Sequence, residues 1–95
     1  MATQVTQTLK KPAGINFYMN ETDSRFQDLI SALPGYVSYT KTYPDENTKV
    51  QVFAFETHDH YVGYLDMINT NQVMIDNRNY NIANNIIYEV AVAEI

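Results

Sequence analysis

The chain has 95 residues, of which 45% are hydrophobic, and its six Lys and Arg against eleven Asp and Glu give a formal net charge of −5. This length suits a single domain, and the negative charge disfavours binding to nucleic-acid phosphates and to anionic lipid. The absence of cysteine excludes disulfides, thiolate metal ligands and thiol nucleophiles.

The sequence also lacks the patterns of a membrane or exported protein. No run approaches the ~20 apolar residues of a transmembrane helix. The N-terminal stretch MATQVTQTLKK has no apolar segment of the kind found in signal peptides. We therefore expect a cytoplasmic protein that has neither nucleic acid nor membrane as a partner.

The N-terminal stretch is polar, and Val5 and Leu9 are the only large apolar residues between Met1 and Lys11 other than Met1 itself. We therefore expect residues 1–13 to form a flexible lead or a weak edge strand, and residues 14–95 to form the single folded domain. Residues Ile15–Asn20 then alternate, with Ile15, Phe17 and Met19 on one side and Asn16, Tyr18 and Asn20 on the other. This alternation predicts the first strand.

The next segment has helical spacing. Ser24 and Gln27 have the form of a capping box. The apolar residues that follow the helical repeat are Phe26, Leu29, Ile30 and Leu33, and Pro34-Gly35 ends the run. The spacing predicts one short helix.

Two strands and a turn follow. Tyr36–Tyr43 and Thr48–Glu56 are rich in aromatic and β-branched residues, and the turn-forming residues Pro44–Asn47 separate them. This pattern predicts a hairpin.

Thr57 is suited to cap a second helix, predicted from His58 to about Asn69, whose apolar stripe is Tyr61, Tyr64, Leu65 and Ile68. Residues 70–85 are rich in asparagine and weakly periodic, so we expect an irregular or short-helical connection anchored by Val73, Met74, Ile75, Tyr80 and Ile82. Ile86–Ile95 alternates again and predicts the last strand.

The predicted order β-α-β-β-α-β is that of an α+β, ferredoxin-like fold: four antiparallel strands with two helices on one face. The strands carry apolar residues on both faces. We expect one face to hold Val50, Val52, Ala54, Val90 and Val92, and the other Phe53, Phe55, Ala91 and Ala93. Two helices can cover only one face, so we expect a second copy of the chain to cover the other.

Two segments resemble a known family. LPGYVSYTKTYPD, Leu33–Asp45, followed by FETHD, Phe55–Asp59, is similar to the dimeric α/β-barrel superfamily, and in particular to its antibiotic-biosynthesis-monooxygenase-like branch. The resemblance implies a homodimer whose two sheets pack face to face, with a small-molecule pocket between sheet and helices in each subunit. It admits cofactor-independent oxygenases and isomerases, cyclases and haem enzymes.

His58 and His60 are the only histidines and the first candidates for catalysis. At a helix N-terminus, residues two apart do not face each other, so we expect no metal at this pair. Either imidazole could act as a general acid or base at the mouth of a pocket. Tyr39 is the third catalytic candidate.

The chain contains eight tyrosines, and most buried tyrosines are structural. Six residues are candidates to line an apolar or aromatic ligand: Phe17, Met19, Tyr39, Phe55, Tyr61 and Tyr88. No nucleotide-binding glycine loop is present, and no cofactor is indicated.

Two functions remain open at this point. One is small-molecule binding in such a pocket, with or without monooxygenase or isomerase chemistry that needs no cofactor. The alternative is a non-catalytic dimerisation or assembly module, and the sequence leaves open whether the protein is an enzyme.

Overall fold

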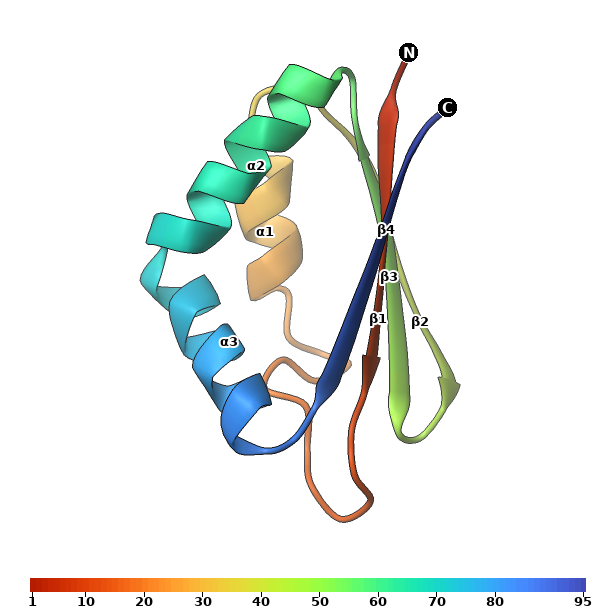
Figure 1. Cartoon of the computed structure of the whole chain (residues 1–95), viewed down its shortest axis with the longest axis vertical. Helices are drawn as coiled ribbons and strands as arrows, with labels where there is room; N and C mark the ends of the chain where they lie inside the picture. The colour runs from red at the N-terminus through yellow and green to blue at the C-terminus, as the bar shows by residue number, and fades with distance from the viewer.

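The computed structural model describes all 95 residues and consists of one antiparallel sheet with three helices on one side (Figure 1). The strands are β1 (Thr3–Lys10), β2 (Tyr36–Asp45), β3 (Thr48–Phe55) and β4 (Ile87–Glu94), in the spatial order β2-β3-β1-β4. The helices are α1 (Arg25–Ser31), α2 (His58–Thr70) and α3 (Gln72–Ala83). The architecture is the predicted α+β, ferredoxin-like one. No helix combines the length and the apolar character needed to cross a membrane.

The N-terminal segment is the first correction. We expected residues 1–13 to be a flexible lead or an edge strand, but β1 lies in the middle of the sheet and pairs with both β3 and β4. Val5 and Leu9 are buried, and Thr3 and Gln7 are buried on the same side of the strand. Hydrogen bonds on both edges hold this polar strand in place, so residues 3–10 belong to the same folded unit as the rest.

The second correction concerns Ile15–Asn20, which is not a strand but part of the long connection between β1 and α1. Its alternating side chains are still sorted, because Phe17 and Met19 are buried while Asn20 is exposed. The backbone gains no strand partner on either side, and the Met19 carbonyl accepts a hydrogen bond from the Lys49 side chain instead.

The predicted helix, hairpin and last strand are confirmed, with small changes. Helix α1 begins after Ser24, but the Ser24 hydroxyl donates to the Asp28 carboxylate and makes no bond to a backbone N–H, so the predicted capping box is wrong. Strand β2 continues through Pro44 to Asp45, which shortens the turn. Thr57 caps α2 as predicted, because its side chain accepts a hydrogen bond from the His60 N–H.

Residues 70–85 are more regular than we expected. Gln72–Ala83 forms α3, a helix of 12 residues, and the Asn71 side chain caps it by accepting from the Val73 N–H. Met74 and Asn81 are buried, whereas Ile82 is exposed. Of the asparagines that hid the helical pattern, Asn71 caps the helix and Asn81 is buried in it.

The register of the sheet sorts its two faces. Val5 pairs with Phe53 and Val92. Gln7 pairs with Gln51 and Val90. All six side chains therefore lie on the helix side of the sheet. The outer face carries Gln4, Thr6, Thr8, Val50, Val52, Ala54, Ala91 and Ala93. The predicted grouping was therefore wrong across strands, since Val90 and Val92 share a face with Phe53 and Phe55, not with Val50.

The core lies between sheet and helices and is largely aromatic. Phe53 and Phe55 on β3 are fully buried and contact Tyr64 on α2 and, for Phe53, Phe26 on α1. These rings meet in tilted or edge-to-face arrangements, which are the favoured ones. A cavity adjoins this core, on the side of α3.

Candidate functional site

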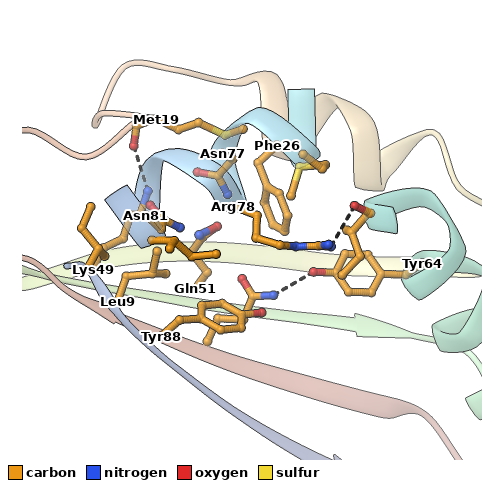
Figure 2. A pocket seen from close by; sticks show the side chains of 15 residues that line it. Leu9, Met19, Phe26, Lys49, Gln51, Tyr64, Asn77, Arg78, Asn81 and Tyr88 are labelled. Carbon is orange, nitrogen blue, oxygen red and sulfur yellow. Dashed lines mark hydrogen bonds between the residues drawn. The ribbon is translucent and has the colours of Figure 1, made fainter. Parts of the chain in front are cut away.

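A cavity of about 330 Å³ lies between the sheet and helices α2 and α3 (Figure 2). Fifteen residues line it: Gln7, Leu9, Met19, Phe26, Lys49, Gln51, Tyr64, Ile68, Met74, Asn77, Arg78, Asn81, Ile82, Ile86 and Tyr88. Nine of them are hydrophobic, and the rest are amides and two basic residues. An apolar cavity with a few converging polar groups is the usual form of a small-molecule site.

The floor of the cavity is polar because the helix side of β1 and β3, which is otherwise apolar, carries hydrophilic residues here. Gln7 lies between Val5 and Leu9, and the partner strand places Gln51 beside it. The Gln7 amide nitrogen donates to the Tyr64 hydroxyl at 2.7 Å, and the Tyr39 hydroxyl donates to Gln51 Oε1 at 3.2 Å. These bonds fix one end of each glutamine amide.

Lys49 is the most deeply buried charged residue at the site, with 4% of its surface exposed. Its Nζ donates to the Met19 carbonyl oxygen at 2.8 Å and lies 4.9 Å from the centre of the Phe17 ring. Burial, with a smaller contribution from the positive charge of Lys41, lowers the pKa of Lys49 to about 8, while Asp23 acts weakly in the opposite direction.

Helix α3 supplies the polar part of the opposite wall. Asn77, Arg78 and Asn81 all line the cavity (Figure 2). The Arg78 guanidinium donates to the Ile68 carbonyl at 3.2 Å and to Asn69 Oδ1 at 2.9 Å, which ties α3 to the end of α2. Arg78 is therefore a positioned cation beside the cavity, held by neutral acceptors.

The tyrosines in or next to the cavity have raised pKa values. Burial raises the pKa of Tyr64, although its bond with Gln7 acts slightly in the other direction. Burial also raises the pKa of Tyr88 to about 12, and it raises the pKa of Tyr39. These phenols are hydrogen-bonding groups at neutral pH, so among these cavity residues Lys49 is the one whose proton equilibrium lies near neutrality.

The cavity opens on the side of β4 and the end of α3. Ile82 and Tyr88 both line it, and they are 72% and 48% exposed. Helix α1 packs against β2, and α2 packs against β3. On β4, Val90 and Val92 point toward the helix side of the sheet, yet they remain 44% and 43% exposed. This leaves an exposed apolar rim at the edge of the cavity.

Of the six predicted ligand-binding residues, the structure places Met19 and Tyr88 in the cavity wall. Phe17 lies one layer away, beneath the Lys49 ammonium and in a small cluster with Leu9 and Ile86. The structure brings these three residues together at the same end of the molecule.

The other three do not line the cavity. Phe55 is fully buried in the aromatic core, and Tyr61 stacks on Tyr64 without reaching the cavity wall. Tyr39, which was also a catalytic candidate, packs on Phe26 and reaches the site only through its bond to Gln51.

The histidines lie elsewhere. His58 is exposed at the start of α2, with Nδ1 3.8 Å from Glu94, and His60 contacts the Thr57 hydroxyl through its Nδ1 at 2.9 Å. Neither lines the cavity. Nowhere in the chain do three His, Asp or Glu side chains gather in a way that could hold a metal ion.

Sequence reasoning missed the polar residues of the cavity, of which Gln7, Lys49 and Gln51 are the most buried. A signal for them existed, because Lys49 and Gln51 continue the Phe53 and Phe55 side of β3 at a spacing of two residues. Polar residues at core-facing positions mark a wet or functional region of a sheet. Asn77, Arg78 and Asn81 could not be found in this way, because residues 70–85 were expected to form an irregular or short-helical connection with no defined face.

The arrangement supplies a defined set of interactions. It offers an apolar enclosure, amides that can both donate and accept hydrogen bonds, and two cations, one of them buried. Lys49 can hold an anion or exchange a proton near neutral pH.

No protein-family profile matches this chain, and no curated protein matches it. Comparison with solved structures gives clear matches. A point mutant of SnoaB, a cofactor-independent oxygenase from Streptomyces nogalater, aligns over 99% of this chain and 92% of its own with a TM-score of 0.75 and 14% identity. Unmutated SnoaB aligns over the same shares with a TM-score of 0.70 and 15% identity.

A protein from Deinococcus radiodurans, provisionally assigned as an antibiotic biosynthesis monooxygenase, is also similar. It covers 98% of this chain and 91% of its own, with a TM-score of 0.65 and 10% identity. Identities this low establish a shared fold alone. The chain therefore shares the fold of SnoaB and of the Deinococcus radiodurans protein over nearly its whole length, in agreement with the resemblance seen in Leu33–Asp45 and Phe55–Asp59.

Proposed function

We propose that this protein binds a small apolar or aromatic molecule in the cavity between its sheet and helices, as a cofactor-independent monooxygenase or isomerase. The observation that carries the proposal is the cavity itself, about 330 Å³ with nine hydrophobic lining residues and converging amide and basic groups. A core that served only to hold the fold together would be filled, because voids of this size are destabilising.

The reaction class is supported by structural similarity. SnoaB, which shares the fold over nearly the whole chain, is a cofactor-independent oxygenase. Cofactor-free chemistry of either kind needs a group that can accept or return a proton at the substrate. Lys49, with a pKa of about 8, is the cavity residue that meets this requirement, in place of His58, His60 or Tyr39.

The alternative is a non-catalytic dimerisation or assembly module. Both functions use the outer face of the sheet in the same way, so dimer formation does not separate them. The cavity favours ligand binding, because an assembly module has no use for an open apolar chamber beside its core. The lack of cysteine fits a cytoplasmic location, which we include in the proposal.

The proposed assembly is a homodimer formed through the outer sheet face. This face has no helix over it and carries Val50, Val52, Ala54, Ala91 and Ala93 among threonines, with Ile87 exposed at its end. At ~25 cal/mol per Å² of apolar surface, covering such a face in two subunits gives a gross driving force on the order of ten kcal/mol before association entropy is subtracted. Two-fold pairing of identical faces closes the contact without leaving sticky surface.

Native mass spectrometry tests ligand binding. We expect the protein to bind or retain a small aromatic molecule. We expect Met74→Trp, which fills the cavity from α3, to abolish this binding, whereas the matched Met67→Trp, outside the cavity lining, leaves it intact. If no aromatic compound from a broad panel binds, or if both variants bind equally, the proposed ligand site is wrong.

Sedimentation at micromolar concentration tests the dimer. We expect a species of twice the 10.9 kDa chain mass. Val52→Asp, on the outer face, should produce monomers that keep their secondary structure. Val62→Asp is the matched control, because Val62 is a comparably apolar residue on α2 with 42% of its surface exposed. A wild-type species of one chain mass would exclude the dimer.

A further inference from the structure

The lining of the cavity has a charge pattern opposite to that of the whole chain. The chain carries six basic and eleven acidic residues, yet two of the six basic residues, Lys49 and Arg78, line the cavity and none of the eleven acidic residues does. An anion is therefore repelled by the protein as a whole and attracted at this one enclosed place.

The Lys49 ammonium forms no ion pair in the folded chain, and Asp23 is the one carboxylate that acts on it, weakly and from a distance. The two ion pairs of the structure are Arg25 with Asp23 and His58 with Glu94, and neither involves Lys49. Its one hydrogen bond goes to the Met19 carbonyl, and the Phe17 ring covers part of the remaining charge. An ammonium group has three donors, so two are left for a partner within the cavity.

A buried, unpaired charge is costly and is normally either paired or neutralised. The Met19 carbonyl and the Phe17 ring compensate it in part, and the cavity that Lys49 lines has room for a further partner.

We propose that the cavity selects an apolar ring system that carries one anionic group, and that the Lys49 ammonium pairs with that group. The inference rests on the proposed ligand site and specifies its ligand class. The apolar wall formed by Leu9, Met74 and Ile86 contacts the rings, and the amides of Asn77 and Asn81 provide further hydrogen bonds. Arg78, held by Ile68 and Asn69, adds a second positive charge from α3.

Two fluorescent probes test this ligand class. 1-Anilinonaphthalene-8-sulfonate and N-phenyl-1-naphthylamine share one ring framework, but only the first carries an anion. We expect the wild-type protein to bind the sulfonate more tightly. Lys49→Met should weaken sulfonate binding by about tenfold or more and leave the neutral probe unchanged or tighter. Amide chemical shifts in the bound protein locate the probe, and shifts at residues lining the cavity are expected.

Two control variants isolate the charge of Lys49. Lys10→Met removes the same charge from an exposed position on β1 and should leave both affinities unchanged. Lys49→Gln keeps a polar side chain, so it reports on the charge if the Lys49→Met protein does not fold.

The outcomes separate this inference from the proposed function. If both probes bind the cavity and Lys49 variants weaken them equally, the anion preference is wrong although the ligand site stands. Tighter binding of the neutral probe to the wild type leads to the same conclusion. If neither probe shifts the cavity residues, the ligand site itself fails and this inference fails with it.

Discussion

The Gln7 amide nitrogen and the Tyr64 hydroxyl oxygen lie 2.7 Å apart, in a hydrogen bond that joins the central strand β1 to helix α2 at the edge of the cavity. Both residues are buried, and they are 57 positions apart in the chain. The bond fixes the orientation of a polar group on the cavity floor while Tyr64 packs against Phe53 and Phe55.

We predict that this bond couples the two residues energetically. Gln7→Leu and Tyr64→Phe should each lower the free energy of unfolding by about 1 kcal/mol, and the double variant should lose about 1 kcal/mol less than the sum, since the bond can be lost only once. Urea denaturation of the four proteins measures this. Gln7→Leu combined with Tyr39→Phe is the control cycle, because Tyr39 bonds to Gln51, and its coupling should be near zero.

A second prediction is that Lys49→Met stabilises the protein at neutral pH. Holding the ammonium charged in the fold, where the pKa of Lys49 is about 8 in place of 10.5, costs on the order of 3 kcal/mol. Loss of the bond to Met19 offsets part of this gain, so we expect a net increase of roughly 1–2 kcal/mol in the free energy of unfolding. Lys10→Met should change it little.

The pH dependence of the same variant gives an independent check. The folded protein binds fewer protons at Lys49 than the unfolded chain between about pH 8 and pH 10.5, so wild-type stability gains from this group as pH rises through that window. The advantage of Lys49→Met should therefore shrink over this range. Tyr39, Tyr64, Lys41 and Asp23 are present in both proteins, so their direct titration cancels in the difference. An advantage that stays constant from pH 7 to pH 10 contradicts a lowered pKa at Lys49.

A third prediction compares two helix caps. Thr57 accepts a hydrogen bond from the His60 N–H, whereas the Ser24 hydroxyl bonds to the exposed Asp28 carboxylate. Thr57→Ala should therefore lower the free energy of unfolding by about 1 kcal/mol, and Ser24→Ala by clearly less. Equal losses in thermal or urea denaturation would show that the cap at Thr57 has no special value.

A fourth prediction compares two glycines with positive φ. Gly35 and Gly14 have φ of +79° and +88°. A Cβ at Gly35 would overlap the ring of His60, whereas a Cβ at Gly14 would meet nothing within 4 Å. Gly14→Ala should cost about 1 kcal/mol for the backbone conformation alone. Gly35→Ala should cost more, about 2 kcal/mol, because the His60 ring must also be displaced from its position beside Thr57. Denaturation midpoints that fall equally would disprove the contact.

The parts of the fold that sequence reasoning found have simple local signals. The hairpin from Tyr36 to Phe55 combines strand-forming residues with a clear turn, and Thr57 and the Tyr61–Ile68 stripe define α2. Strand β1 has no such signal. It alternates threonine and glutamine with only two apolar residues facing the helices, and its place in the sheet depends on two partners distant in sequence.

The site was harder to predict than the fold for a related reason. Aromatic residues such as Phe55 and Tyr61 suggested a ligand pocket, yet they fill the core, while the cavity forms where the aromatic packing stops and Lys49 and Gln51 begin. Met19 and Tyr88, which were also predicted to contact a ligand, do line the cavity. The position of α3 over the sheet decides that the aromatic core is filled while the neighbouring apolar region stays open as a cavity. No local pattern in residues 70–85 predicts that position.

The central position of β1 has a consequence for folding. Its two partners, β3 and β4, lie far along the chain, and Thr3 pairs with Glu94, 91 residues away. The backbone groups on one edge of β1 therefore find their partners only after nearly the whole chain is available. Such long-range pairing makes folding slow and strongly dependent on topology. Of the four strands β1 comes first in the chain, yet its pairing with β4 is completed only when the last strand is available. Until then the hairpin of β2 and β3 is the only part of this sheet that local contacts can form.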